Sequence, residues 1–102
     1  MAEMARQVVV ARALTREAAA TRDRGAAASE VATPASLAKW TASDAAMRVP
    51  MDAVQLFVGA GCSHETGVER LMRDAKGAQI YEGTNQVHRG IVADATLGRP
   101  RG

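Results

Sequence analysis

The spacing of apolar residues is the feature that most limits what this 102-residue chain can fold into. Near the start of the chain, apolar side chains recur at steps of three and four residues, at Met4, Val8, Ala11, Leu14 and Ala18. That spacing places them on one face of an α-helix. No segment alternates apolar and polar residues for long, as a half-buried β-strand would. The pattern therefore predicts an all-α protein without a β-sheet.

Two long helices are expected in the first part of the chain. The first covers residues 2–24 and stops at Gly25, and a small-residue linker follows as far as Pro34. The second is expected from Pro34 to about Val58, with Thr33 as N-cap and Pro34 in the first helical position, where its missing N–H costs nothing. Pro50 also lacks a donor, but the apolar stripe continues beyond it, so we expect a kink there rather than a break.

Two shorter helices are expected in the second part of the chain. Gly59-Ala60-Gly61 should end the second helix, a third should cover 68–78, and Thr84 should cap a fourth that runs to about Leu97. Two ion pairs at i,i+4 spacing support the third helix, namely Glu69 with Arg73 and Arg70 with Asp74. The expected architecture is one domain over 1–98, an antiparallel bundle of two long and two shorter helices, with a flexible tail at 99–102.

Composition limits both stability and the classes of function. Hydrophobic residues make up 47% of the chain and aromatic residues only 3%, and many of the former are alanines, which bury little area each. Such a bundle should be marginally stable alone and should gain from a partner. The net charge of +2 is spread along the chain rather than gathered in a patch, so a nucleic-acid partner is not expected.

The sequence predicts no membrane span, no disulfide within the chain and no metal site. The apolar run at residues 8–11 is far too short for a signal peptide or a membrane span, so we expect a cytoplasmic protein. Cys62 is the only cysteine, which excludes a disulfide within the chain. His64 and His88 do not share metal-ligand spacing with it, so no metal site is predicted.

Several segments of the chain are similar to one protein family. The two most specific are 68–76 (VERLMRDAK) and 79–86 (QIYEGTNQ), and weaker similarity lies at 2–5, 38–46 and 52–55. On these segments the chain resembles the C-terminal helical domain of the acyl-CoA dehydrogenases, flavoenzymes that desaturate acyl-CoA thioesters in fatty acid β-oxidation. The similarity runs nearly from end to end.

The resemblance implies a catalytic base and a cofactor, FAD. The glutamate of the Tyr-Glu-Gly-Thr turn is the base in many family members, although some carry it on another helix, and here it is Glu82. A base for a weakly acidic thioester α-proton must be desolvated and held within about 3 Å of that proton. Burial would raise the pKa of the carboxyl, whereas the helix that begins at Thr84 would lower it.

Further contacts follow from the same resemblance. The positions that it assigns to FAD are Gln55, Gly59, Gly61, Gly83, Thr84 and Gln86. It also implies an acyl-CoA substrate, electron-transfer flavoprotein as a redox partner, and assembly into a homo- or hetero-oligomer. Val58 stands where the family has a glycine, and Gly77 stands inside the third helix, where it costs roughly 1 kcal/mol of helix propensity.

The other domains of the family have no counterpart in these 102 residues. We therefore expect the isolated chain to be catalytically incompetent. Other hypotheses remain: a non-enzymatic helical module that associates with itself or with a full-length dehydrogenase subunit, one part of a split enzyme, and, as a distant alternative, a small DNA-binding bundle.

Overall fold

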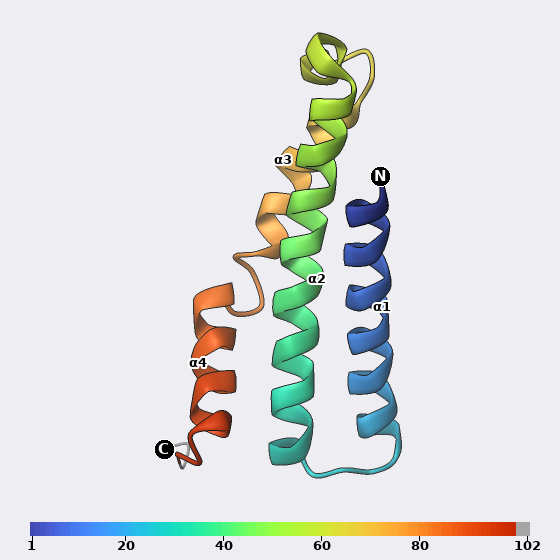
Figure 1. The fold of residues 1–102 in the computed structure, drawn as a ribbon. Helices are drawn as coiled ribbons and strands as arrows, with labels where there is room; N and C mark the ends of the chain where they lie inside the picture. Colours follow the sequence, from blue (N-terminus) through green and yellow to red (C-terminus); the bar gives the residue numbers. More distant parts are fainter. Residues whose placement is uncertain (100–102) are drawn as a thin grey trace.

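The computed structural model describes residues 1–99, which form four α-helices and one short 3-10 helix. In chain order the elements are α1 (Ala2–Asp23), α2 (Ala28–Leu56), η1 (Val58–Cys62), α3 (Val68–Ala78) and α4 (Asn85–Thr96), as drawn in Figure 1. These 99 residues contain no strand, so the all-α prediction is confirmed. Positions 100–102 of the predicted tail lie outside the described residues. No helix within 1–99 is both long and apolar enough to cross a bilayer.

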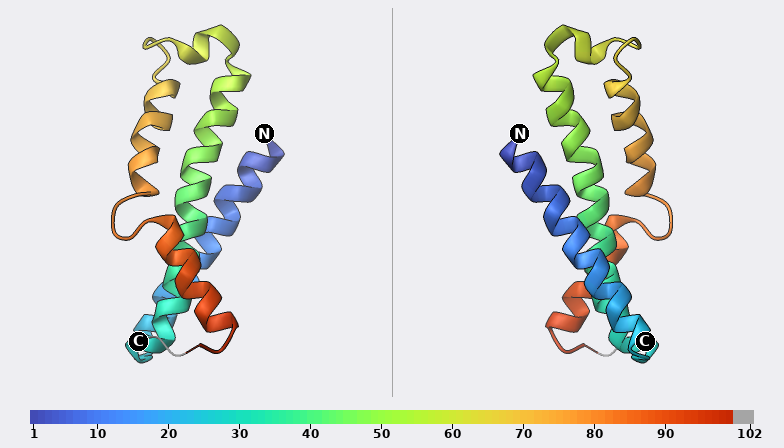
Figure 2. Two further views of the ribbon diagram at one scale, coloured as in Figure 1. Left: turned by 90° about the vertical axis from the view of Figure 1, so that its left-hand side faces the viewer. Right: turned by 90° about the vertical axis from the view of Figure 1, so that its right-hand side faces the viewer.

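Helix α2 is the centre of the arrangement. In Figure 1, α1 runs antiparallel along one side of it, while α3 and α4 follow one another along the other side. Each of these three helices contacts α2, and within the described residues α1 contacts neither α3 nor α4. Figure 2 shows that α1 crosses α2 obliquely, so that its N-terminal end diverges from the bundle. The predicted antiparallel bundle of two long and two shorter helices is confirmed.

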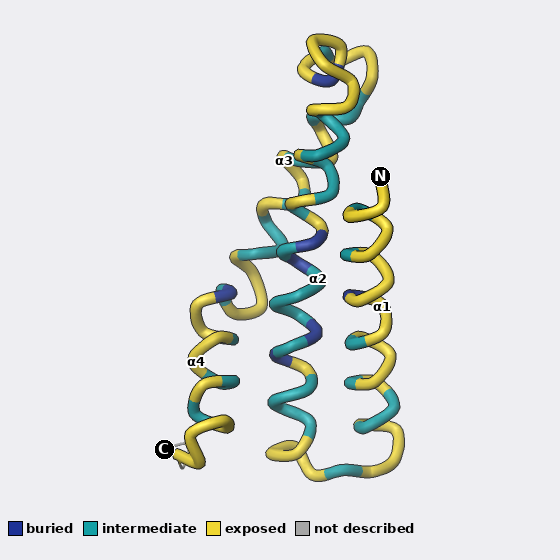
Figure 3. The backbone as a smooth tube through the Cα atoms, viewed as in Figure 1, coloured by how far each residue is buried: buried dark blue, intermediate teal, exposed yellow. Residues whose placement is uncertain are grey.

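The core between these helices is thin. Its buried apolar side chains within residues 1–99 are Ala11, Ala38 and Ala45, and Figure 3 shows how few positions are dark blue. Small side chains let helices approach closely, but they remove little apolar area from water. Met51, in the C-terminal part of α2, and Phe57, directly after this helix, are 43% and 52% exposed. The C-terminal part of α2 therefore lacks a complete cover.

The predicted start of the second helix is wrong. Helix α2 begins at Ala28, and the Glu30 carboxylate accepts a hydrogen bond of 2.8 Å from the backbone N–H of Ala27. That bond satisfies a donor that the first turn would otherwise leave without a partner. Pro34 consequently lies inside the helix instead of at its first position. The helix continues past Pro50 without a break, as predicted.

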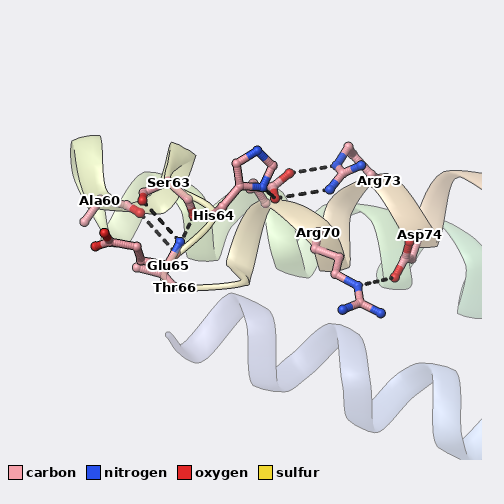
Figure 4. Close-up of polar contacts among 9 residues, drawn as sticks. Ala60, Ser63, His64, Glu65, Thr66, Arg70, Arg73 and Asp74 are labelled. Atoms are coloured by element: carbon pink, nitrogen blue, oxygen red, sulfur yellow. Dashed lines mark hydrogen bonds and ion pairs between the residues drawn. The ribbon is translucent and has the colours of Figure 1, made fainter.

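The second helix ends two residues before the predicted position near Val58. Helix α2 stops at Leu56, and Gly59-Ala60-Gly61 lie within η1 rather than acting as a plain stop signal. Val58 begins η1 with φ of 53°, in the left-handed region. Figure 4 shows the loop that follows, where the Thr66 hydroxyl donates to the carbonyl of Ala60 at 3.0 Å.

The two shorter helices are as predicted. Helix α3 covers the expected residues, and its Glu69–Arg73 ion pair has an N–O distance of 2.7 Å (Figure 4). Helix α4 begins after Thr84, whose hydroxyl accepts a hydrogen bond from the N–H of Val87. The i,i+4 ion pairs of α3 and the Thr84 cap of α4 are signals in the local sequence, which explains why these helices could be predicted.

Candidate functional site

The loop between α3 and α4 carries the predicted base on an unusual backbone. The N–H of Tyr81 bonds to the Gly77 carbonyl at 3.0 Å, and the N–H of Asn85 bonds to the Gln79 carbonyl at 3.1 Å. Between these two bonds, Glu82 has φ of 55° and Gly83 has φ of 89°. A left-handed backbone costs a residue with a side chain about 1–2 kcal/mol. The surrounding structure must therefore hold Glu82 in place.

Two side chains contact the carbonyls of this turn. Lys39 on α2 donates from Nζ to the Gly83 carbonyl oxygen at 2.6 Å. His88 on α4 places Nε2 3.2 Å from the Glu82 carbonyl oxygen and Nδ1 3.1 Å from the Ser36 hydroxyl. A carbonyl oxygen only accepts, so the geometry assigns the proton to Nε2 and leaves Nδ1 to accept from Ser36.

Asn85 connects the turn to α2. Its side chain is 3% exposed. Its Oδ1 accepts hydrogen bonds from Lys39 Nζ at 3.0 Å and from the Ser43 hydroxyl at 2.9 Å. Its Nδ2 donates to Asp44 Oδ1 at 2.8 Å. The buried amide thus has partners for both its oxygen and its nitrogen, as burial requires.

Asp44 extends this network toward both shorter helices. Its carboxylate accepts from Gln79 Nε2 at 2.8 Å and from Trp40 Nε1 at 2.9 Å. Arg89 lies 3.8 Å from the same carboxylate, and its guanidinium lies 5.0 Å from the centre of the Trp40 ring. Trp40 is half-buried and joins the polar network through these contacts.

Sequence reasoning missed most of this network. Lys39, Asp44 and Asn85 had no predicted role, and His88 was considered only as a metal ligand. A signal was present, because polar residues interrupt the alanine stripe of α2 at helical spacing. A polar residue on the face that packs against other helices must find a partner there.

Glu82 lies at the surface of this chain. Its side chain is exposed and lines a hollow of about 310 Å³ together with Tyr81, Ala78 and Lys39. The desolvation expected of a base is therefore not supplied by these 99 described residues. It would have to come from atoms that cover the hollow.

The other predicted site residues form two separate groups. Thr84 and Gln86 line a hollow of about 410 Å³ beside the Glu82 turn. Gln55, Gly59 and Gly61 lie near the opposite end of α3, an 11-residue helix whose length is about 16 Å. The structure therefore does not bring the two groups together within this chain.

The two glycines of the second group have different surroundings. A Cβ atom built on Gly59 would meet nothing within 4 Å. A Cβ atom built on Gly61 would lie 2.9 Å from Val54 Cα and closer still to the Val54 carbonyl oxygen. Gly61 is thus required for packing η1 onto α2, whereas Gly59 leaves its backbone open to an approaching group.

The side chains considered for metal binding lie apart. His64 has Nδ1 3.1 Å from Glu69 Oε1, and His88 contacts Ser36. Cys62 is exposed. Within residues 1–99 no group of three or more His, Cys, Asp or Glu side chains could hold a metal ion.

Comparisons with known proteins give a consistent assignment. The family model described as "Acyl-CoA dehydrogenase, C-terminal domain" matches residues 1–97. Cyclohex-1-ene-1-carbonyl-CoA dehydrogenase of Geobacter metallireducens is 50% identical over 97 residues, which are 95% of this chain and 25% of that protein.

Solved structures agree with the sequence relatives. Butyryl-CoA dehydrogenase from Megasphaera elsdenii superposes with a TM-score of 0.87 at 46% identity, over 94% of this chain and 24% of that one. A chain in the structure of the electron transferring flavoprotein of Acidaminococcus fermentans gives a TM-score of 0.89 at 45% identity, over 95% of this chain and 25% of that one. The chain thus spans about a quarter of the length of the proteins that it matches.

Proposed function

Because the chain belongs to the acyl-CoA dehydrogenase family, whose C-terminal domain it matches over residues 1–97, we propose that it forms the C-terminal helical portion of a flavin-dependent enzyme that desaturates acyl-CoA thioesters. The observation that carries this proposal is the placement of Glu82. Its carboxylate stands on a left-handed turn just before the capped N-terminus of α4, beside an open hollow. Fatty acid β-oxidation is the process to which such an enzyme would belong.

In this enzyme Glu82 would remove the α-proton of the thioester. A carboxylate in water is a weak base for so weak an acid, so the site must exclude water around it. Glu82 is exposed in this chain. The acyl-CoA and the rest of the enzyme would therefore have to cover the hollow that Glu82 lines, and that cover would raise the pKa of its carboxyl.

The residues at two surfaces of the chain fit a bound FAD. Gly59 has open space where a side chain would stand, and Gln55 is exposed near it. At the other surface, Thr84 and Gln86 line a hollow at the N-terminus of α4, where backbone N–H groups favour an anionic group. Gly83 would allow close approach of the backbone. When bound, FAD would accept the hydride that leaves the β-carbon of the substrate.

Gly61 needs a different explanation from the one that the resemblance implied. The backbone of Val54 occupies the space that a Cβ atom on Gly61 would need, so glycine is required there by packing within the chain. Its contribution to a cofactor site would therefore be indirect, through the placement of η1. The two surfaces lie at opposite ends of α3, so neither surface alone supplies all of the positions that the resemblance assigns to FAD.

These features imply that the isolated chain does not turn over substrate. A hollow of about 310 Å³ at Glu82 and another of about 410 Å³ at Gln86 are open, and neither can enclose a flavin with an acyl-CoA. Electron-transfer flavoprotein is the partner that we propose for reoxidation of the flavin, and an oligomer is the assembly that we propose for completing the site.

A chimeric enzyme tests this function. The matched C-terminal quarter of the Megasphaera elsdenii butyryl-CoA dehydrogenase is replaced by residues 1–97, and flavin content and dye reduction with butyryl-CoA are measured. We expect a yellow, active protein whose kcat falls at least about 1000-fold in Glu82→Gln, since the base acts in the transition state. Glu65→Gln, which removes an exposed carboxylate of the loop before α3, is the matched control and should retain activity.

Two outcomes would contradict the proposal. One is a folded chimera without flavin or turnover, and the other is full activity in Glu82→Gln. The isolated 102-residue chain with added FAD and butyryl-CoA is assayed in parallel, and turnover there that depends on Glu82 would contradict the claim that the chain alone is incompetent.

A second candidate function is a non-enzymatic module that associates with itself or with a dehydrogenase subunit. Exposed apolar side chains favour it, since Val9, Leu56 and Leu71 are 61%, 55% and 59% exposed. Co-purification with a dehydrogenase subunit that retains its own complete C-terminal domain would favour this module over the enzyme portion.

A further inference from the structure

We infer that Lys39 and His88 are positioning residues that hold the Glu82–Gly83 turn from two different helices and thereby aim the Glu82 carboxylate. This inference rests on the proposed function, because it concerns the aim of the proposed base. We call the pair the turn clamp.

The turn clamp acts on two consecutive carbonyl groups. His88 Nε2 donates to the carbonyl of Glu82, and Lys39 Nζ donates to the carbonyl of Gly83. Fixing these oxygens orients the two peptide planes that follow Glu82, and the bond from the Tyr81 N–H to the Gly77 carbonyl holds the chain before it. Together these bonds restrain the backbone rotation of Glu82. The direction of the Glu82 side chain is set by that rotation. Without the clamp, Glu82 would relax from φ of 55° toward the ordinary negative range.

Each member of the clamp is anchored at a second point. His88 is held through Nδ1 by the hydroxyl of Ser36, which is 3% exposed. Lys39 also donates to Oδ1 of the buried Asn85 at 3.0 Å. The second contact already holds each side chain in one conformation. The contact with the turn therefore costs little further side-chain conformational entropy.

The imidazole ring also fills the space beside Gly83. A Cβ atom on Gly83 would lie 2.9 Å from His88 Nε2. The ring therefore packs directly against the turn, and the φ of 89° at Gly83 excludes most other residues there. The absence of a side chain at Gly83 thus leaves the room that the His88 ring occupies.

The clamp is distinct from the cap of α4. The N-terminus of that helix is capped by the Thr84 hydroxyl, which accepts from Val87. The carbonyls of Glu82 and Gly83 precede the helix and take no part in its hydrogen bonding. A role limited to helix stability would therefore not require Lys39 or His88 to contact them.

Steady-state kinetics of the chimeric enzyme test the histidine. We expect His88→Leu to lower kcat about 10- to 100-fold and to leave KM within about twofold, because misplacing a base affects the transition state and not ground-state binding. The kinetic isotope effect with α-deuterated butyryl-CoA should rise, since proton removal becomes slower. His88→Gln retains an N–H near the position of Nε2 and should restore most of kcat.

The control is the other histidine. His64→Leu removes a ring that is 91% exposed and contacts Glu69 away from the turn, and it should leave kcat and the isotope effect unchanged. Lys39→Met removes the second donor and retains most of the side-chain stem, so it should reproduce the effect of His88→Leu. Flavin content and circular dichroism establish that the variants are folded. Unchanged kcat and isotope effect in folded His88→Leu and Lys39→Met would overturn the inference.

A separate measurement distinguishes failure of the clamp from failure of the proposed function. Backbone chemical shifts of the 102-residue chain report the sign of φ at Glu82 without any turnover. We expect positive φ in the wild type and in His88→Gln, and a shift to negative φ in His88→Leu. Positive φ retained in His88→Leu would overturn the clamp even if the chimera is active, whereas an inactive wild-type chimera contradicts only the enzymatic function.

Discussion

Left-handed backbone at residues with side chains occurs at two positions within residues 1–99, Val58 and Glu82. Glu82 is the proposed base, and side chains from α2 and α4 hold the turn on which it lies. Val58 is a β-branched residue, for which this conformation is least favourable, and its side chain is 75% exposed. Because this side chain is so exposed, its packing does little to offset the backbone strain at Val58.

Val58→Gly should therefore stabilise the fold. Glycine adopts φ of 53° without steric cost, and after the loss of chain entropy is subtracted we expect a gain of about 1 kcal/mol in the free energy of unfolding. Urea denaturation, monitored by circular dichroism, measures this gain. Val9→Gly, on the exposed surface of α1, is the matched control and should destabilise by about 0.5 kcal/mol. Equal effects of the two substitutions would contradict strain at Val58.

The glycines of η1 allow a second matched pair. Gly61→Ala should lower the free energy of unfolding by about 1–3 kcal/mol, because the added methyl group would collide with the backbone of Val54. Gly59→Ala adds the same group where nothing lies within 4 Å and should change stability by no more than about 0.5 kcal/mol. Thermal unfolding of both variants is the measurement. A Gly61→Ala protein as stable as Gly59→Ala would mean that η1 does not pack tightly on α2.

At the scale of elements, one buried amide joins the start of α4 to α2. Asn85 bonds to Lys39, Ser43 and Asp44 at the start of α4. Asn85→Ala should lower the free energy of unfolding by about 2–4 kcal/mol, because it leaves several polar groups of α2 without their partner. Gln86→Ala, at the exposed neighbouring position, should have little effect. Chemical denaturation measures both, and a small loss in Asn85→Ala would show that water replaces the amide readily.

Helix α3 should respond to acid through Glu69. The Arg73 side chain hydrogen-bonds to Glu69 and holds the pKa of its carboxyl below the usual 4.5, and burial opposes this effect more weakly. A carboxyl whose pKa is lowered by folding stabilises the folded state above its unfolded pKa, and the contribution is lost as pH falls through the folded value. Wild type should therefore lose stability relative to Glu69→Gln below about pH 4.5. Parallel unfolding curves between pH 2 and 7, with Glu65→Gln as control, test this, and a constant difference across that range would contradict it.

The elements also show what the sequence could and could not predict. Helix α3 and the cap of α4 were predicted correctly, because Thr84 and the i,i+4 ion pairs are local signals. The start of α2 was missed, since alanine stands at its N-cap and the stabilising group is the Glu30 carboxylate three residues later. Its end lies within two residues of the prediction, and Val58 turns the chain there with a positive φ.

The residues of the candidate site also divide into those that the sequence predicted and those that it did not. Glu82 and Thr84 were predicted from their motif; Glu82 lies on a left-handed turn and Thr84 caps α4, while their roles toward substrate and cofactor stay predictions. Lys39 and Asn85 lie 46 positions apart along the chain, and their contact exists only after α4 packs on α2. A single sequence gives a polar residue on a packing face, but it does not give the partner that satisfies it.

At the scale of the whole molecule, the chain is extended for its size. Its radius of gyration is 16.0 Å, against about 13 Å for a compact domain of this length. It exposes 6857 Å², whereas roughly 5,500 Å² is typical of a compact monomer of 10.7 kDa. The excess fits a layer that is completed by other protein surfaces, as the proposed function requires.

Self-association of the isolated chain tests this reading of its surface. Apolar side chains left in water favour contacts between copies, and Val9 on the outer side of α1 is 61% exposed. Sedimentation velocity should show a weight-average mass that rises with concentration in the wild type. Val9→Glu should shift the distribution toward the monomer, because it places a charge in the apolar surface at a position that helix geometry tolerates. Ala19→Glu, exposed on the same helix, adds the same charge away from Val9 and should still associate. A wild-type chain that is monomeric and stable at every concentration would contradict the interaction module and would leave the exposed surface to be covered only within a complete enzyme.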